Sequence, residues 1–187
     1  MVKKSKKNIK NTRKSILLYI SSGVIIGLIL LFIFLILIPT VNNNIRKDRI
    51  ISIYKSLNID EQKYIVQSVS IFGDKRPYEW DASRSYSSSI RYVRSADVKT
   101  TVAELKKSIA ATNFTFYEEP YPGSADFMYI YKSPNNEYLR VSASSKTRND
   151  EFFNKLHMGL STENITTDPN TGPTSVEIKV NLDDNNE

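Results

Sequence analysis

The sequence predicts an α+β protein, with one N-terminal transmembrane helix followed by one small domain that has a mainly antiparallel sheet and two or three helices. Residues 16–38 form an uncharged apolar run. Beyond this run, short stretches of alternating apolar and polar residues indicate strands. One stretch with helical spacing lies between strand candidates, and a hairpin follows it, which favours a sheet with helices packed on one face.

The apolar run is long enough to cross a membrane. It has 23 residues, of which 18 are Leu, Ile, Val or Phe. As a helix it spans roughly 34 Å, more than the ~30 Å of a hydrocarbon core. Removal as a signal peptide is the main alternative. However, signal peptides have apolar stretches of only about 7–15 residues, and no small-x-small cleavage site follows this run. We therefore expect an uncleaved single-pass signal-anchor.

The charges that flank the run predict its orientation. The tail of residues 1–15 holds seven Lys and Arg residues and no acidic residue, whereas Arg46, Lys47 and Arg49 are the first cations after the run. The side richer in Lys and Arg stays in the cytoplasm. We therefore expect a plasma-membrane protein with a cytoplasmic N-terminus and an extracytoplasmic C-terminal domain.

Within the predicted membrane helix, Gly23 and Gly27 form a G-x-x-x-G pair. Small residues at this spacing let two membrane helices approach closely, which predicts a homodimer face. Glycine is also common in membrane helices without this role.

The overall charge of +6 does not indicate nucleic acid. Seven of the 26 Lys and Arg residues lie in the tail, so the rest of the chain carries 19 basic against 20 acidic side chains. A nucleic-acid interface needs a concentrated basic face, which this balance does not predict. The chain has no cysteine, so the exported domain has no disulfide. Together with a composition rich in Lys, Asn and Ile, this favours a bacterial cell envelope.

Residues 39–60 are expected to connect the membrane to the domain. Residues 41–44 are polar and indicate a short stalk. Ile50, Ile53, Tyr54 and Leu57 then recur at helical spacing, which predicts a juxtamembrane amphipathic helix. This helix either caps the domain or lies on the lipid headgroups. We expect it to cap the domain.

Residues 61–182 are expected to form one α+β domain, followed by an acidic tail at 183–187. A capping box of Thr101 and Glu104 predicts the start of the best-specified helix. Two helices are predicted, at 99–112 and 150–160. Strands are predicted at 64–72, 88–94, 114–118, 127–132, 137–144 and 176–182.

No residue pattern predicts catalysis, and we expect no cofactor and no metal. His157 is the only histidine. The spacing of Asp168, Asn170 and Gly172 is similar to the start of a calcium loop, but Lys179 stands where the loop needs Glu. Adjacent carboxylates such as Glu118 and Glu119 point to opposite faces of a strand and form no acid/base pair.

The predicted hairpin offers one candidate binding surface. Its aromatic side chains would lie on the outer face together with Arg140 if the other face, with Met128, Ile130, Leu139 and Val141, lies in the core. Tyrosine presents a flat apolar body with a hydroxyl to sugars or partner proteins. Alternatively, a helix covers this face, and 150–160 with its two Phe residues is the candidate. The contact residues that this interpretation proposes are Phe127, Tyr129, Tyr131, Tyr138 and Arg140.

The predicted loop at 73–87 offers a second candidate. It holds Arg76, Trp80 and Arg84. Arginine and aromatic residues are enriched at interaction hot spots. Alternatively, Trp80 packs into the core and the rest of the loop is solvated.

These observations favour a non-catalytic interaction or assembly subunit of the cell envelope, with other envelope proteins as partners. In topology alone, the layout resembles single-span subunits of pilus, secretion or division machines. The alternative is a surface module that contacts cell-wall polysaccharide, a cell-wall glycan, through a Tyr-rich sheet face. An enzyme is the least favoured class.

Overall fold

The computed structural model describes residues 19–73, 85–122, 124 and 126–183. It forms two compact units. The first contains the described helix up to residue 44, and the second contains the remaining described residues from 45 onward.

The first unit is an apolar helix. One helix runs over Tyr19–Ser56, with a π-helical turn η1 at Ile33–Leu37 followed by α2 at Ile38–Ser56. Up to residue 38 its apolar side chains are largely exposed, as a membrane span or a signal sequence requires. Pro39 has no N–H to donate, and π-helical turns commonly accommodate such a gap. The expected stalk at 41–44 is therefore helical.

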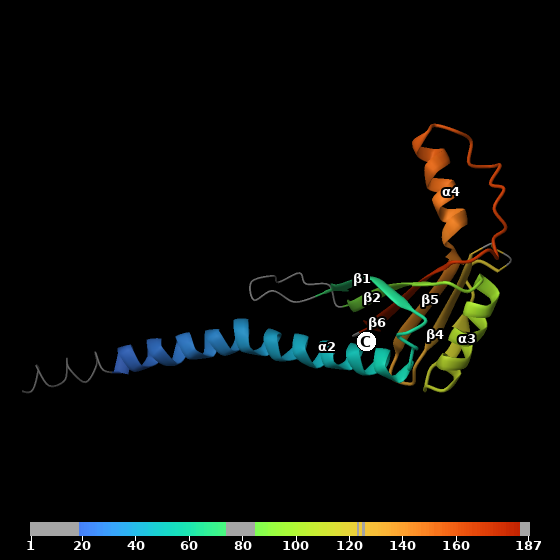
Figure 1. Ribbon diagram of the computed structural model, residues 1–187. Coiled ribbons are helices and arrows are strands. Elements are labelled where there is room, and N and C mark those ends of the chain that lie inside the picture. The colour runs from blue at the N-terminus through green and yellow to red at the C-terminus, as the bar shows by residue number, and fades with distance from the viewer. Residues whose placement is uncertain (1–18, 74–84, 123, 125, 184–187) are drawn as a thin grey trace, which may run out of the picture. The chain divides into compact units, whose positions relative to one another are not determined.

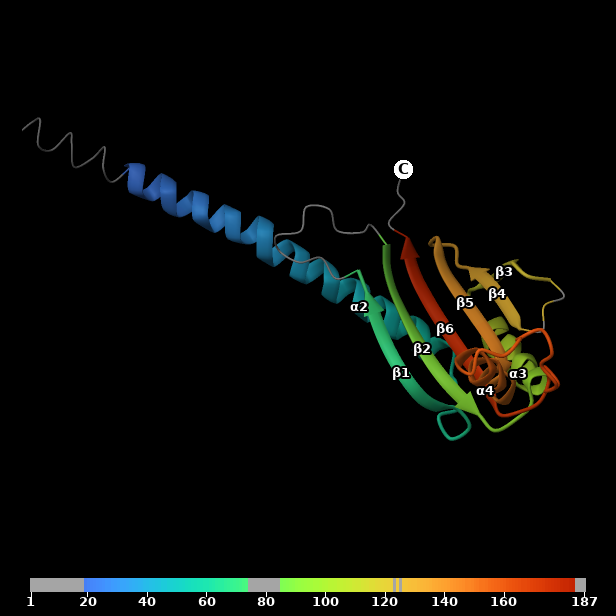
Figure 2. The same cartoon turned by 90° about the horizontal axis from the view of Figure 1, so that it is seen from above.

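The second unit is built on a six-stranded antiparallel sheet, which confirms the predicted fold class. The strand order is β1-β2-β6-β5-β4-β3, so β6, the last strand in the sequence, lies between β2 and β5 (Figure 2). The strands are β1 (Ile65–Phe72), β2 (Ser85–Arg94), β3 (Thr115–Glu118), β4 (Phe127–Lys132), β5 (Glu137–Ser145) and β6 (Thr174–Asp183).

One face of the sheet, here called the covered face, packs against the end of α2 and against α3 (Val98–Ala110) (Figure 1). Ile50, Ile53 and Leu57 of this segment are at most 3% exposed, which confirms that it caps the domain. Amphipathic spacing thus predicted the buried side of this helix correctly. On α3 the buried side chains follow the same periodicity: Val98, Thr101, Val102, Leu105 and Ile109.

The predicted capping box at the start of α3 is wrong. Asp97 is the N-cap, and its carboxylate accepts hydrogen bonds from the amide and the hydroxyl of Thr100. Thr101 is fully buried, and its hydroxyl donates to the Asp97 carbonyl. Glu104 instead accepts a 2.6 Å hydrogen bond from Arg94. The aspartate cap lies one turn ahead of the expected one, and it satisfies the Thr100 amide, one of the orphan amides of the first turn.

Of the described helices, none lies across the other face of the sheet, here called the open face. α4 (Lys146–His157) rises from one end of this face, on the side opposite α3 (Figure 1). It begins four residues before the predicted start because the Ser145 side chain caps it, accepting from the Arg148 amide. None of its residues is buried.

Candidate functional site

Three of the hairpin aromatics lie on the covered face, so the interpretation that places them on an outer face is wrong for these three. Tyr131 lies directly across from Leu139, and Tyr129 across from Val141. Directly paired residues of antiparallel strands share a face. Both tyrosines are therefore in the core, 7% and 8% exposed, and Phe127 packs against the same core.

The helix that covers these tyrosines is α3 and not the expected 150–160 segment. Val102, Leu105 and Ile109 of α3 enclose a small internal space together with both tyrosine rings. The Lys106 ammonium lies 4.0 Å from the centroid of the Tyr129 ring. A helix therefore does cover the aromatic face, as the alternative interpretation proposed, but the helix is α3.

Tyr138 and Arg140 do lie on the open face, opposite to the buried tyrosines. The structure adds Tyr117, Lys132 and Lys179 to them. The rings of Tyr117 and Tyr138 meet edge to face with centroids 6.0 Å apart. The Lys132 ammonium lies 5.8 Å from the first ring and 5.1 Å from the second. Tyr117 and Lys179 were missed because only long-range pairing brings β3 and β6 beside β4 and β5. Lys132 lies on the hairpin itself, directly across from Tyr138, so the hairpin register would have identified it.

The other predicted contact residues have no structural test. Arg76, Trp80 and Arg84 lie outside the described residues. Gly23 and Gly27 lie on the apolar helix, where a Cβ at either position would meet no atom within 4 Å. The homodimer face stays a prediction.

Strand β1 forms one edge of the sheet and carries no charged residue. Its apolar side chains are exposed on both faces. Val66, Val69 and Ile71 lie on the covered side, across from Tyr92, Ile90 and Ser88 of β2. Ile65 and Phe72 lie on the other side. The exposed fractions of these five side chains run from 43% to 63%.

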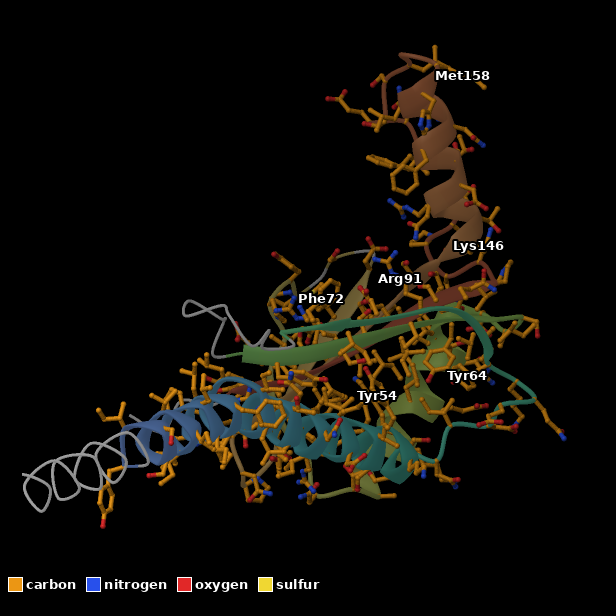
Figure 3. All side chains as sticks on the ribbon, turned by 90° about the vertical axis from the view of Figure 1, so that its left-hand side faces the viewer. Tyr54, Tyr64, Phe72, Arg91, Lys146 and Met158 are labelled. Atoms are coloured by element: carbon orange, nitrogen blue, oxygen red, sulfur yellow. The ribbon has the colours of Figure 1, made fainter. Side chains whose placement is uncertain are left out.

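A groove of about 450 Å³ separates β1 from α2 on the covered side. Ile51 and Lys55 line its helical wall, and Val66 and Tyr92 line its sheet wall. At its base, the Tyr54 hydroxyl donates 2.9 Å and 3.0 Å hydrogen bonds toward the carbonyls of Ser88 and Ile178. Burial raises the pKa of the Tyr54 phenol to about 12. Figure 3 shows Tyr54 and Tyr64 on this side of the sheet and Arg91 on the other.

An ion pair between Arg49 and the buried Glu137 fastens α2 to the hairpin; the two side chains are 38% and 8% exposed. The Arg49 guanidinium donates to both carboxylate oxygens of Glu137, and the Ser133 hydroxyl donates to the same carboxylate at 2.7 Å. Burial of the Glu137 carboxyl raises its pKa, but the hydrogen bonds from Arg49 and Ser133 outweigh this effect and hold the pKa below its usual value. The pair is a structural clamp, because hydrogen bonds from the protein surround the carboxylate.

α4 and the segment that follows it form an arm held by polar contacts. The Glu151 carboxylate accepts hydrogen bonds from the side chain and amide of Thr167 and from the Thr166 amide, and Lys155 lies 3.0 Å from it. These contacts hold the pKa of Glu151 well below its usual range. Met158 at the tip is 72% exposed, far from Lys146 at the base (Figure 3).

His157 lies on this arm, where its Nδ1 is 2.7 Å from the Phe153 carbonyl of its own helix. In the described part of the chain, no group of three or more His, Asp or Glu side chains is placed to hold a metal ion. The residues around Asp168 form a turn, in which the Asn170 side chain accepts from the Lys99 amide at 2.9 Å. The absence of an enzymatic role stays a prediction.

Comparison with protein families, curated proteins and solved structures gives no significant match. A function for the chain therefore has to be inferred from its own surfaces, of which the β1 edge and the cluster on the open face are the most distinctive.

Proposed function

We propose that this protein is a membrane-anchored, extracytoplasmic assembly subunit of the cell envelope that binds an extended strand of another envelope protein at its β1 edge. The observation that carries the proposal is the uncharged, apolar and exposed β1 strand. The apolar helix and the basic tail before it support a single-pass anchor with the N-terminus in the cytoplasm.

An exposed sheet edge presents unpaired backbone donors and acceptors, so proteins usually protect edges with charges, proline or short strands. The opposite edge, β3, follows this rule: it has four residues, ends at Glu118 and is followed by Pro120. β1 has eight residues, no charge and no proline, and its pairing is interrupted only by a bulge between Val66 and Ser68. A strand added to β1 would satisfy its backbone groups, which is the recognition mode called β-augmentation.

The groove beside β1 indicates the chemistry of the added strand. Side chains on one side of that strand would enter the groove toward Ile51 and Val66. They would meet the apolar side chains of Ile51, Val66 and Ile90, with Lys55 and Glu61 also lining the groove. We therefore infer a strand with apolar side chains at alternate positions, because alternate residues of a strand point to the same face.

A second copy of this chain is the competing occupant of the edge. Two identical strands can pair antiparallel about a two-fold axis perpendicular to their sheet. The experiment below separates the two occupants by mass, because a second copy gives a band of twice the chain's own mass.

In-cell photo-crosslinking of the full-length protein tests the proposal. We expect a probe at Val69 to give one discrete heavier band that contains a second protein, and a probe at Thr115 on the β3 edge to give none. Adding Val69→Lys should abolish the band from a probe at Ile71 without changing the thermal midpoint, because a charge on an edge opposes strand pairing. A band of twice the chain's own mass, or equal bands from both edges, would overturn the proposal.

A further inference from the structure

We propose that the cluster on the open face of the sheet is a binding site for an anionic polysaccharide, a chain of sugar units that carry carboxylate or phosphate groups. The site consists of Tyr117, Lys132, Tyr138, Arg140 and Lys179. It lies on β3 to β6, on the face opposite the groove, so its failure and the failure of the β1 proposal are separate outcomes.

The sheet register brings these residues onto one surface. Lys132 pairs directly with Tyr138, and Arg140 pairs directly with both Ile130 and Lys179. Directly paired residues share a face. A hollow of about 240 Å³ lies between them, lined by Ile130, Tyr138, Arg140, Lys179 and Asn181. The hollow is shallow and open, a form that suits one side of a polymer.

The charges at this surface favour an anion. Arg140 and Lys179 are like charges directly across from each other, an arrangement that destabilises a strand pair unless something neutralises it. Among the described residues, Arg140, Lys179 and Lys132 form no ion pair with a carboxylate. Glu177 interacts electrostatically with Lys179, but its carboxylate already accepts hydrogen bonds from Ser89 at 2.7 Å and Arg91 at 3.1 Å. Glu118, across from Ile130, is the acidic side chain at the β3 margin of the site.

The aromatic rings favour sugar over a simple anion. Tyr117 is 56% exposed, and Tyr138 is partly exposed beside it. Exposed tyrosine rings offer a flat apolar surface and a hydroxyl, which match the apolar face and the hydroxyl groups of a sugar ring. The Lys132 ammonium above both rings would place a cation next to a sugar held there.

Calorimetry with the full-length protein in neutral detergent micelles tests this site. The probe is a purified oligo-uronate, and neutral dextran of the same length is its control. We expect the oligo-uronate to bind with an affinity that falls as salt rises, because charge attraction is screened, and we expect no binding of dextran. Arg140→Gln and Lys179→Gln should each weaken binding by about tenfold, the size expected for loss of a charge-assisted contact.

Two further variants complete the test. Lys146→Gln removes the same charge from the arm and should leave binding unchanged. Tyr138→Leu should weaken binding while the thermal midpoint stays close to that of the wild type, which distinguishes sugar contact from simple charge attraction. Equal binding of a single-stranded oligonucleotide, equal binding of dextran, or unchanged binding by the Arg140 and Lys179 variants would overturn the proposal.

Discussion

The two faces of the sheet differ although the same strands build both. Along β6, Val176 and Ile178 lie on the covered face and are at most 1% exposed. Glu177 and Lys179 alternate with them on the open face and stay partly exposed. Alternation separates two sets of side chains, but the helices decide which set becomes core. Tyr131 is buried because α3 lies over its face, so aromatic content alone does not identify an outer surface.

The largest difference between the two faces should appear in how much a substitution lowers the free energy of unfolding. Leu139→Ala removes a fully buried side chain of the covered face and should lower the free energy of unfolding by about 2–5 kcal/mol. Ser142→Ala, three residues along β5 and on the open face, should change it by less than about 0.5 kcal/mol. Urea unfolding of the full-length protein in micelles, followed by circular dichroism, measures both. Equal losses would show that the open face is packed as tightly as the covered one.

A smaller difference in the free energy of unfolding is expected between loss of the Arg49–Glu137 pair and loss of the Arg91–Glu177 pair. Glu137→Gln breaks the clamp with Arg49 and should cost about 1–3 kcal/mol, because the Glu137 side chain is only 8% exposed and its charge accepts hydrogen bonds from Arg49 and from the buried Ser133 hydroxyl. Glu177→Gln breaks the pair with Arg91 on the open face. Since the Arg91 and Glu177 side chains are 63% and 38% exposed, its cost should stay below about 1 kcal/mol. The same unfolding measurement compares them, and a larger loss at Glu177 would reverse the comparison.

The clamp also has a pH signature. The pKa of Glu137 in the folded protein is below its usual value. Its contribution to stability is therefore complete above the pKa of the unfolded chain and is lost as the pH falls through the folded pKa. We expect the wild type and Glu137→Gln to differ in free energy of unfolding at pH 7 and to converge as the pH falls below the lowered pKa of Glu137. A difference that is constant across this range would contradict the assignment.

The smallest effect should be confined to the arm. Glu151→Gln removes the charge that accepts from the Thr166 and Thr167 amides. Hydrogen exchange at these two amides should become faster, while the unfolding midpoint stays the same, because the arm buries no residue in the core. Asp150→Asn is the control, since Asp150 contacts Lys146 and not these amides. Equal acceleration by the control would refute the role of Glu151.

Local patterns predicted the elements of the fold and which side of most of them is buried. The alternation around Ile178 and the helical spacing of Val102 and Leu105 are local properties, and the structure agrees with both. In contrast, β4 has apolar side chains on both faces, so alternation alone does not choose between Tyr131 and Ile130 as the core residue. The pairing register of β4 decides which of the two residues lies in the core. A register shift of one residue would move the side chains of β4 to the opposite faces of the sheet.

The candidate site on the open face was predicted only in part. Tyr138 and Arg140 follow from the hairpin, because both lie on one strand at even spacing. Lys179 joins them through the pairing of β5 with β6, and Tyr117 through the pairing of β3 with β4. Such pairing depends on interactions between distant segments, which no local periodicity contains. The β1 edge was missed for the same reason, since strand order determines which strand is outermost.

The central position of β6 has a consequence for how the protein folds during its synthesis. β1 and β2 form one antiparallel hairpin, and β3, β4 and β5 form a second antiparallel set. Among the described strands only β6 pairs with both sets, and it follows all of them in the chain, so it is synthesised after them. The β1–β2 hairpin and the β3–β5 set therefore each keep an unpaired strand edge until β6, Thr174–Asp183, has been made and can pair with both. A chaperone that shields strand edges would act in this interval, and a chain that stalls before residue 174 would remain two unjoined halves.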